Sequence, residues 1–331
     1  MKFPWDKLEF KKVEPGKKQD GIKINPYLMD EIGQMNSPFP HDIGWKTVPL
    51  ITNPQLEYEI KSYPDGAKYV VVKKIHQNLT FRLNSYEDLW ILNQIHDVVK
   101  SAGRSVTVTI PFLIDSQADR RFSNDQPHGL KLVCNFLNGL TNFNYKVFHP
   151  HNAEVVEALL DRVEILDNKS FINSVLHSIS ELWRMNVDPD NLILMSSDAG
   201  GFKPLMKLTD KLKWQGETFS ASKSRKYEDG HSKLVQQVDR QDFGGKDILI
   251  IDDICVYGGT FKGLAKMLRE RNCGKLYLAV SHMTMQELGE DPVTNYFDRV
   301  FTTNSKFDHY FMKGTIIADK VYAPTEIIKI F

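Results

Sequence analysis

From residue 69 onward, short apolar runs alternate with longer amphipathic segments, and this alternation limits the possible folds more than any other feature of the chain. The apolar runs are typical of strands and lie at residues 69–75, 105–114, 145–149, 191–197, 246–252 and 275–282. The amphipathic segments are typical of helices and lie at residues 84–103, 127–140, 152–160, 170–185, 201–212 and 260–272. Strands joined through single helices pair in parallel and are covered by those helices. The pattern therefore predicts an α/β protein with mostly parallel sheets flanked by helices.

The alternation falls into two sets, which predicts two α/β domains joined near residues 165–172. We place the first domain at residues 56–168 and the second at residues 169–331. Residues 1–55 are rich in Pro, Lys and Asn and have weak periodicity, so we expect an irregular N-terminal extension there.

Composition excludes several classes of protein. Lys plus Arg and Asp plus Glu balance at 42 each, so no net charge draws the chain to nucleic acid or to an anionic membrane. No apolar run has the length of a signal peptide core or of a membrane span. The cysteines are too few and too scattered for a disulfide framework or a zinc site (Cys134, Cys255 and Cys273). We expect a cytoplasmic globular protein.

The stretch "ILIIDDICVYGGT", residues 248–260, carries the strongest chemical signal. An apolar strand runs into Asp252 and Asp253, and a loop with two glycines leads to Thr260 at the start of a helix. Ligands of open parallel sheets lie beyond the carboxyl ends of the strands. The backbone N–H groups of such a loop suit a phosphate, and the carboxylates suit sugar hydroxyls or a hydrated Mg²⁺. A ribose phosphate presents both groups at once.

This spacing resembles the ribose-phosphate binding signature of type I phosphoribosyltransferases and ribose-phosphate pyrophosphokinases. Further segments resemble the second family in a consistent order: "SYPDGAKYV", "IPFLIDSQADRRFSNDQPHGLKLVCNFLN", "YKVFHPHNAEVV", "LILMSSDAGGFKPLMKLTDKL" and "SASKSRKY". The resemblance covers about residues 56–305. It implies two phosphoribosyltransferase-like domains, with ATP bound on the first and ribose phosphate on the second.

The resemblance implies a role for each matching residue. The ribose phosphate would be bound by Asp252, Asp253, Val256, Tyr257, Gly258, Gly259 and Thr260, and ATP by Tyr63, Asp65, Asp119 and Arg120. Mg²⁺ would be held by His151 and Asp198, and the catalytic cations on a mobile lid would be Lys223 and Arg225. The implied reaction moves the β,γ-diphosphate of ATP to the anomeric hydroxyl of ribose 5-phosphate and releases AMP.

Several of these residues also have purely structural interpretations. His151 follows Pro150 and suits an ordinary loop, and Asp198 before two glycines suits a helix N-cap. Lys223 and Arg225 lie in a highly charged stretch that suits a solvated loop. Only the ordered set of motifs favours the functional interpretation.

The sequence departs from the family pattern at three places. Gln117 and Ala118 replace an Arg-Gln pair, Ala67 replaces an acid in the nucleotide hairpin, and Val256-Tyr257 replaces Asp-Thr in the phosphate loop. An exposed aromatic ring at residue 257 would suit a larger acceptor, and ADP-ribose, whose product belongs to NAD salvage, is the alternative substrate. A non-catalytic regulatory subunit of a pyrophosphokinase is an alternative of another class, and a phosphoribosyltransferase is a further one.

The resemblance also implies a homo-oligomer, a dimer or a hexamer, in which the nucleotide hairpin reaches a neighbouring site. Tyr63 and Asp65 would then act in the active site of another subunit.

Overall fold

The computed structural model describes residues 54–121, 123–183, 188–228, 231–284, 287–288, 291–307, 311–312 and 325–331. The expectation of an irregular extension over residues 1–55 therefore lies almost wholly outside the described residues. No helix within the described part of the chain is long and apolar enough to cross a membrane.

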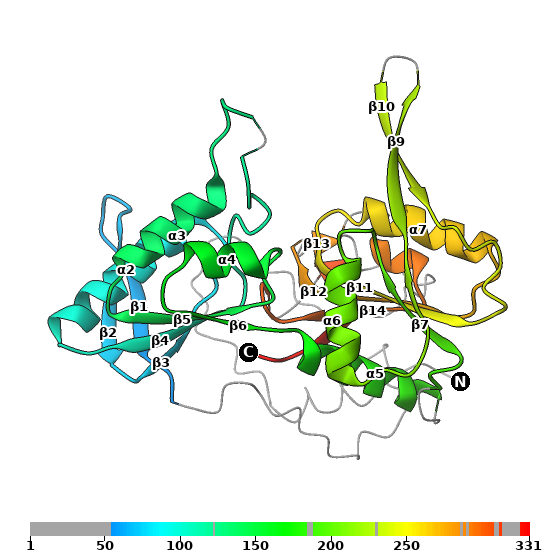
Figure 1. The fold of residues 1–331 in the computed structure, drawn as a ribbon. Coiled ribbons are helices and arrows are strands. Elements are labelled where there is room, and N and C mark those ends of the chain that lie inside the picture. Colours follow the sequence, from blue (N-terminus) through cyan, green and yellow to red (C-terminus); the bar gives the residue numbers. More distant parts are fainter. Residues whose placement is uncertain are drawn as a thin grey trace, which may run out of the picture. The chain divides into compact units, whose positions relative to one another are not determined.

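The first half of the described chain forms a four-stranded sheet with the strand order β3-β4-β5-β6, and every pair in it is parallel. Its strands are β3 (Asn78–Thr80), β4 (Val106–Ile110), β5 (Phe143–Phe148) and β6 (Val163–Leu166). The helices that connect them are α2 (Tyr86–Ser101), α3 (Gly129–Gly139) and α4 (Ala153–Leu159) (Figure 1). A capping box between Ser85 and Asp88 fixes the start of α2, close to the start of the predicted helix at residue 84.

An antiparallel hairpin precedes this sheet and consists of β1 (Glu57–Ser62) and β2 (Lys68–Lys74). It is joined to α2 by Gln94, whose amide nitrogen donates to the Lys68 carbonyl at 3.1 Å. The Gln94 amide oxygen accepts from the Val70 N–H at 3.0 Å. Only the second strand of this hairpin is predicted by the apolar pattern, because most of β1 is exposed.

The second half forms a six-stranded sheet with the order β16-β14-β12-β11-β7-β8, again parallel throughout. Its strands are β7 (Leu192–Ser196), β8 (Thr218–Ser220), β11 (Asp247–Cys255), β12 (Leu276–Met283), β14 (Arg299–Thr303) and β16 (Thr325–Ile328). The accompanying helices are α5 (Lys169–Trp183), α6 (Phe202–Leu212) and α7 (Gly259–Glu270). Short elements complete this half: β13 (Glu287–Leu288), β15 (Phe311–Met312) and the 3-10 helix η2 (Val293–Tyr296).

Burial on both faces explains the apolar runs of the central strands. All residues of β7 and β12 are buried, as parallel strands between two layers of helices require. Two parallel sheets flanked by helices are the α/β architecture that the sequence predicts, and that prediction is confirmed. The domain boundaries at residues 56–168 and 169–331 stay a prediction.

One segment differs from its predicted conformation. The sequence predicts a mobile loop-like lid around Lys223 and Arg225, whereas β9 (Ser222–Glu228) pairs with β10 (His231–Gln237) in an antiparallel ribbon. Figure 1 shows this ribbon extending away from the six-stranded sheet. Its charged residues hide the strand signal, because they leave no alternation of apolar and polar residues from which a strand could be predicted.

The two sheets meet through the segments that follow their strands. The half-buried His149, after β5, contacts the hydroxyl of Ser281 in β12 at 2.7 Å through its Nδ1 atom. Nε2 of His282 lies 3.0 Å from the His149 carbonyl oxygen. The Arg82 guanidinium, after β3, donates to the Asn304 carbonyl at 2.8 Å. The carboxyl ends of both parallel sheets therefore face a common region.

Candidate active site

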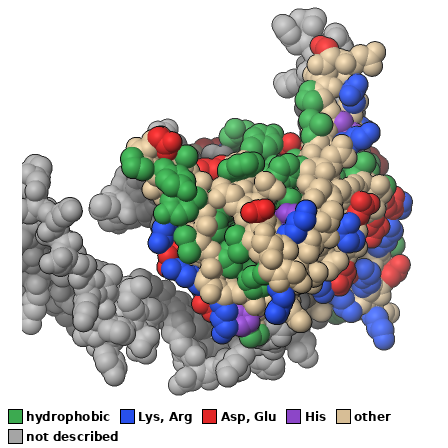
Figure 2. Space-filling model, turned by 90° about the vertical axis from the view of Figure 1, so that its left-hand side faces the viewer, with side chains coloured by type: hydrophobic (Ala, Val, Ile, Leu, Met, Phe, Trp, Pro, Cys, Tyr) green, Lys and Arg blue, Asp and Glu red, His purple; other side chains and the backbone are tan. Residues whose placement is uncertain are grey.

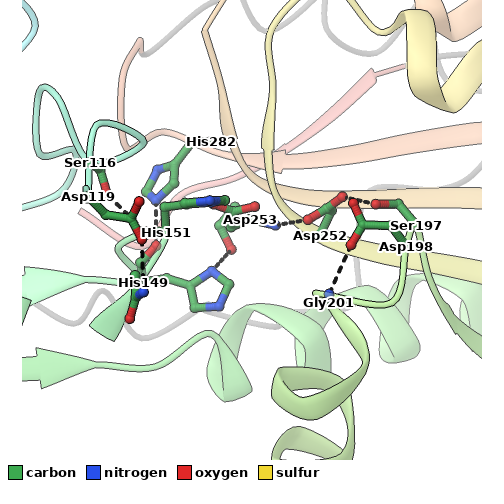
Figure 3. A network of polar contacts seen from close by, with 12 residues as sticks. Ser116, Asp119, His149, His151, Ser197, Asp198, Gly201, Asp252, Asp253 and His282 are labelled. Carbon is green, nitrogen blue, oxygen red and sulfur yellow. Dashed lines mark hydrogen bonds and ion pairs between the residues drawn. The ribbon is translucent and has the colours of Figure 1, made fainter. Parts of the chain in front are cut away.

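Asp252 and Asp253 lie within β11, which continues to Cys255. The sequence predicts instead that the strand ends near Asp252 and that a loop begins at residue 254, so that boundary is wrong. Consecutive strand residues point to opposite faces, so the two carboxylates have different surroundings. The Asp252 carboxylate accepts from the Ser197 hydroxyl and, at 2.8 Å, from the Asp253 N–H. The Asp253 carboxylate contacts Nδ1 of His151 at 2.6 Å (Figure 3).

The two neighbouring carboxylates hold protons with different strength. Burial, followed by the charge of Asp253, raises the pKa of Asp252 to about 7. Burial also disfavours the charge of Asp253, but the hydrogen bonds with His151 and Asp252 outweigh it and hold the pKa of Asp253 well below its usual range. The same bond to Asp253 raises the pKa of His151 against the effect of burial. The site therefore has one firmly ionised carboxylate and one that titrates near neutral pH.

The loop after β11 turns sharply at Gly258. This residue has a φ of +76°, and a Cβ atom built on it would lie 2.7 Å from Cβ of Val293. Helix α7 begins at Gly259, one residue before the predicted start, and no side chain caps its N-terminus. Val256 and Thr260 are half-buried, whereas Tyr257 is 79% exposed. The N–H groups of a helix start that no side chain caps suit an anion, as the sequence predicts for the ribose phosphate.

Asp198 follows β7 and lies in the turn before α6. Its Oδ1 atom accepts from the Gly201 N–H at 3.0 Å, which closes the turn. The N-cap of α6 is Gly201, so the N-cap interpretation of Asp198 is wrong. Figure 3 draws Asp198 beside Ser197, which links it to the surroundings of Asp252. The metal role of Asp198 stays a prediction.

The residues contributed by the four-stranded sheet follow β4 and β5. The His151 N–H donates to the Ser116 hydroxyl at 2.8 Å, which joins the two loops. The Asn152 amide donates to the Asp119 carboxylate at 2.9 Å, and Arg120 is exposed next to it. The structure therefore brings His151 and Asp119, predicted for metal and ATP, to the same edge as Asp253, predicted for the ribose phosphate.

Tyr63 and Asp65 lie in the turn of the β1–β2 hairpin. The Asp65 carboxylate accepts from the Ala67 N–H at 3.0 Å, and the rings of Tyr63 and Tyr69 lie 4.4 Å apart. Tyr63 is 54% exposed. In the view of Figure 1 the hairpin lies on the side of the four-stranded sheet that faces away from the six-stranded sheet. The nucleotide roles of both residues stay predictions.

Lys223 and Arg225 lie in β9, where their backbones pair with Gln236 and Leu234. The ribbon emerges from the region of Asp198, because the Ala221 N–H donates to the Ser196 carbonyl at 3.1 Å. Their catalytic roles stay predictions, and their side chains lie outside the described ones.

Sequence reasoning missed several polar residues at the carboxyl ends of the strands. They are Ser116, Ser197, Ser281, His282 and Ser305, and the motifs give no role to His149. Nδ1 of His282 contacts the Ser305 hydroxyl at 2.8 Å, and burial lowers the pKa of His282 to about 4. The available signal is a polar pair directly after an apolar strand, as in "LAVSH" and "FTTNS".

The residues at this edge of the sheets fit Mg²⁺ only together with a substrate. The described residues contain no group of three or more His, Cys, Asp or Glu side chains that would hold a metal ion by themselves. Mg²⁺ with nucleotides commonly uses one or two protein ligands and substrate phosphates, so such a group is not required. His151 bonds to Asp253 through Nδ1, which leaves Nε2 for a ligand in the arrangement that orients metal-binding histidines. The donor set therefore fits a cation that is shared with a phosphate.

Comparisons with known proteins agree with the two-sheet fold. The family described as phosphoribosyl transferase domain matches residues 161–312. The ribose-phosphate pyrophosphokinase of Thermococcus kodakarensis is 26% identical over 255 residues, which cover 76% of this chain and 86% of that protein. Ribose-phosphate pyrophosphokinase 1 of Listeria monocytogenes is 23% identical over 275 residues, which cover 80% of this chain and 78% of that one.

A solved structure shows the same architecture. The phosphoribosylpyrophosphate synthetase of Mycobacterium smegmatis superposes with a TM-score of 0.62 at 17% identity. The match covers 83% of this chain and 86% of that one. It therefore includes both sheets.

Proposed function

Because this chain belongs to the ribose-phosphate pyrophosphokinase family, at about a quarter sequence identity over most of its length, we propose that it transfers a diphosphate from ATP to a ribose phosphate. The β,γ-diphosphate moves to the anomeric hydroxyl of ribose 5-phosphate, and AMP is the second product. The contact between His151 and Asp253 at 2.6 Å is the observation that supports this proposal most strongly. It joins a residue expected on the ATP side to one expected on the ribose side.

The reaction needs position and charge stabilisation more than covalent chemistry. The anomeric oxygen attacks the β-phosphorus and forms a new P–O bond. The bond from that phosphorus to the α,β-bridging oxygen breaks, and AMP leaves with the electron pair. The hydroxyl proton passes to solvent or to the leaving phosphate. Asp252 and Asp253 accept hydrogen bonds from the ribose hydroxyls, and residues 256–260 bind the 5-phosphate through backbone N–H groups.

His151 and Asp198 would hold Mg²⁺, which would supply positive charge to neutralise the oxygens of the polyphosphate. Lys223 and Arg225 approach from the β9–β10 ribbon and stabilise the charge that develops on the transferred group. Asp119, Arg120, Tyr63 and Asp65 bind the nucleotide.

Tyr257 supports a second candidate acceptor. The Tyr257 ring is 79% exposed and lies beside the helix start that would bind the phosphate, so it can stack on an adenine base of the acceptor. ADP-ribose carries such a base. The transfer to its terminal ribose is otherwise the same reaction and gives ADP-ribose pyrophosphate. The third possibility, a regulatory subunit without activity, has less support because both strand-end carboxylates and His151 are in place.

The deciding experiment incubates the purified chain with ATP, Mg²⁺ and either ribose 5-phosphate or ADP-ribose, and follows AMP release and product mass. AMP with a diphosphate gain on ribose 5-phosphate supports the first candidate. A gain on ADP-ribose alone supports the second, and a Tyr257→Thr substitution should then weaken that acceptor selectively. No AMP with either acceptor contradicts both and favours the regulatory subunit.

A further inference from the structure

Lys306 lies just beyond β14, at the carboxyl end of the six-stranded sheet. The four-stranded sheet holds its backbone in place. The Asn84 amide donates to the Lys306 carbonyl at 3.2 Å, and Arg82 donates to the Asn304 carbonyl at 2.8 Å. Asn304 and Ser305 are buried, so the position of Lys306 is fixed on both sides of the junction. An amine on such a segment is preorganised for a ligand.

The ammonium group of Lys306 faces aromatic rings. Its Nζ atom lies 4.4 Å from the centre of the Phe112 ring and 5.7 Å from that of Phe307. None of its contacts within the described part of the chain is an ion pair with a carboxylate. Burial alone lowers the pKa of Lys306. A half-buried cation without a counter-ion is costly, and a bound anion would relieve that cost.

The Phe112 ring connects Lys306 to the candidate active site. Phe112 contacts His282 edge-on, with ring centres 5.4 Å apart. It also borders a small cavity together with Gln117, His151 and Asp253. Gln117 and Ala118, on the loop after β4, are neutral. Lys306 therefore places positive charge at the edge of a site whose nearest described carboxylates would otherwise repel a polyphosphate.

We propose that Lys306 binds a phosphoryl oxygen of the nucleoside triphosphate and thereby supplies a cation that the loop after β4 lacks at Gln117 and Ala118. The proposal rests on the proposed function, because it assigns Lys306 to the donor in the same reaction. The acceptor does not depend on it.

The test measures binding of α,β-methylene-ATP with Mg²⁺ by calorimetry, because this analogue cannot release AMP. We expect Lys306→Met to weaken binding by about tenfold to a hundredfold, the usual effect of one lost charged hydrogen bond. Lys306→Arg keeps the charge and should stay within about threefold of the wild type. Adenosine, which has no phosphate, should bind the wild type and Lys306→Met equally.

Two further variants sharpen the test. Lys100→Met removes an exposed lysine at the far end of α2, and it should leave binding unchanged. Adding Gln117→Arg to Lys306→Met should restore part of the affinity, since it returns a cation to the same site. The wild type offers a measurement without substitution: the analogue should slow acetylation of Lys306, read by mass spectrometry, and leave Lys100 unaffected.

The two proposals fail in different ways. Equal binding of the analogue by the wild type and Lys306→Met, or acetylation of Lys306 at an unchanged rate, overturns the role of Lys306 even if AMP is released. Weakened binding in Lys306→Met together with no AMP from the wild type on either acceptor keeps this role and contradicts the transfer reaction. A wild type that does not bind the analogue overturns the role of Lys306 as well.

Discussion

Asp252 and Asp253 are neighbours in the chain, yet they change the free energy of unfolding with pH in opposite directions. Asp252 keeps its proton up to about pH 7 in the folded protein, whereas an unfolded chain releases it near its ordinary value of 3.8. The folded state therefore binds more protons over this interval, and its free energy of unfolding falls as the pH rises through it. Asp253 acts in the opposite sense at lower pH, since its pKa is depressed. A charge at Asp252 thus lowers the free energy of unfolding above neutral pH.

The substitution Asp252→Asn should therefore stabilise the ligand-free protein above neutral pH. Asn can still accept from the Ser197 hydroxyl and carries no charge, so we expect the gain at pH 8 to exceed the gain at pH 5 by on the order of 2 kcal/mol. Thermal unfolding at both values measures it. Asp210→Asn, an exposed change on α6, is the control and should show no such difference. A gain of equal size at both pH values would contradict the assigned pKa.

His151 offers a second test at this scale, based on its contact with Asp253. If Nε2 of His151 binds the cation, His151→Ala should raise the Mg²⁺ concentration for half-maximal AMP release by about tenfold or more. The control is His76→Ala, a histidine beside Glu57 in the hairpin region. An unchanged Mg²⁺ requirement in His151→Ala, with a reduced rate, would assign His151 to another role.

The turn between β11 and α7 is the element that most restricts the site. At Gly258 a side chain meets both a left-handed backbone and Val293, whereas Gly259 has nothing within 4 Å of an added Cβ atom. We expect Gly258→Ala to cost about 2 kcal/mol or more and to raise the KM for the acceptor. Gly259→Ala should not cost stability, because no protein atom lies within 4 Å of the added Cβ atom. Unfolding by urea and acceptor kinetics check both variants, and equal behaviour of the two would contradict this account of the turn.

The β9–β10 ribbon carries a separate prediction. Lys223→Ala and Arg225→Ala should each lower kcat by about a hundredfold or more, because charge stabilisation in the transition state is lost. Lys226→Ala removes a charge from the same strand and should keep most of the activity. A drop of similar size in all three would indicate a general charge effect in place of specific contacts.

The predictability of the elements follows from their burial. Helix α2 and strands β7 and β12 are recovered from the sequence, because a buried face leaves a clear period in the apolar residues. The strands β1 and β9 are missed because their charged residues carry no such period. Within the site, Asp253 and His151 are predicted from motifs, but their contact is not. It joins residues 102 positions apart, and only the meeting of the two sheets creates it.

The arrangement of the whole described chain bears on assembly. Figure 2, a view from the side of the four-stranded sheet, shows several groups of hydrophobic side chains at the surface. The large exposed ones from the hairpin, α2 and α3 are Ile60, Tyr63, Tyr86, Trp90, Val98 and Leu132. Exposed aromatic residues of this kind are typical of protein interfaces. They support the prediction that the chain forms a homo-oligomer in which Tyr63 serves a neighbouring subunit.

Subunit complementation tests this prediction. Tyr63→Ala and Arg225→Ala should each be weakly active alone. When the two variants are co-expressed and purified through different tags, mixed oligomers should recover about a quarter to a half of the wild-type AMP release. The reason is that one active site of a mixed oligomer then has an intact Tyr63 from one subunit and an intact Arg225 from the other. Without recovery in verified mixed oligomers, the hairpin acts within its own subunit or not at all.

The ribbon of β9 and β10 also affects which sequence changes such a protein can tolerate during evolution. Its strands pair with each other. One end is fixed by the hydrogen bond from the Ala221 N–H to the Ser196 carbonyl, and the other by the hydrogen bond from the Arg271 guanidinium to the Val238 carbonyl. Length and charge can therefore vary between these anchor points without disturbing the register of the sheet below. Insertions, deletions or a grafted tip from a relative should be tolerated there. Such exchanges give evolution, or a protein engineer, a way to alter rate independently of folding.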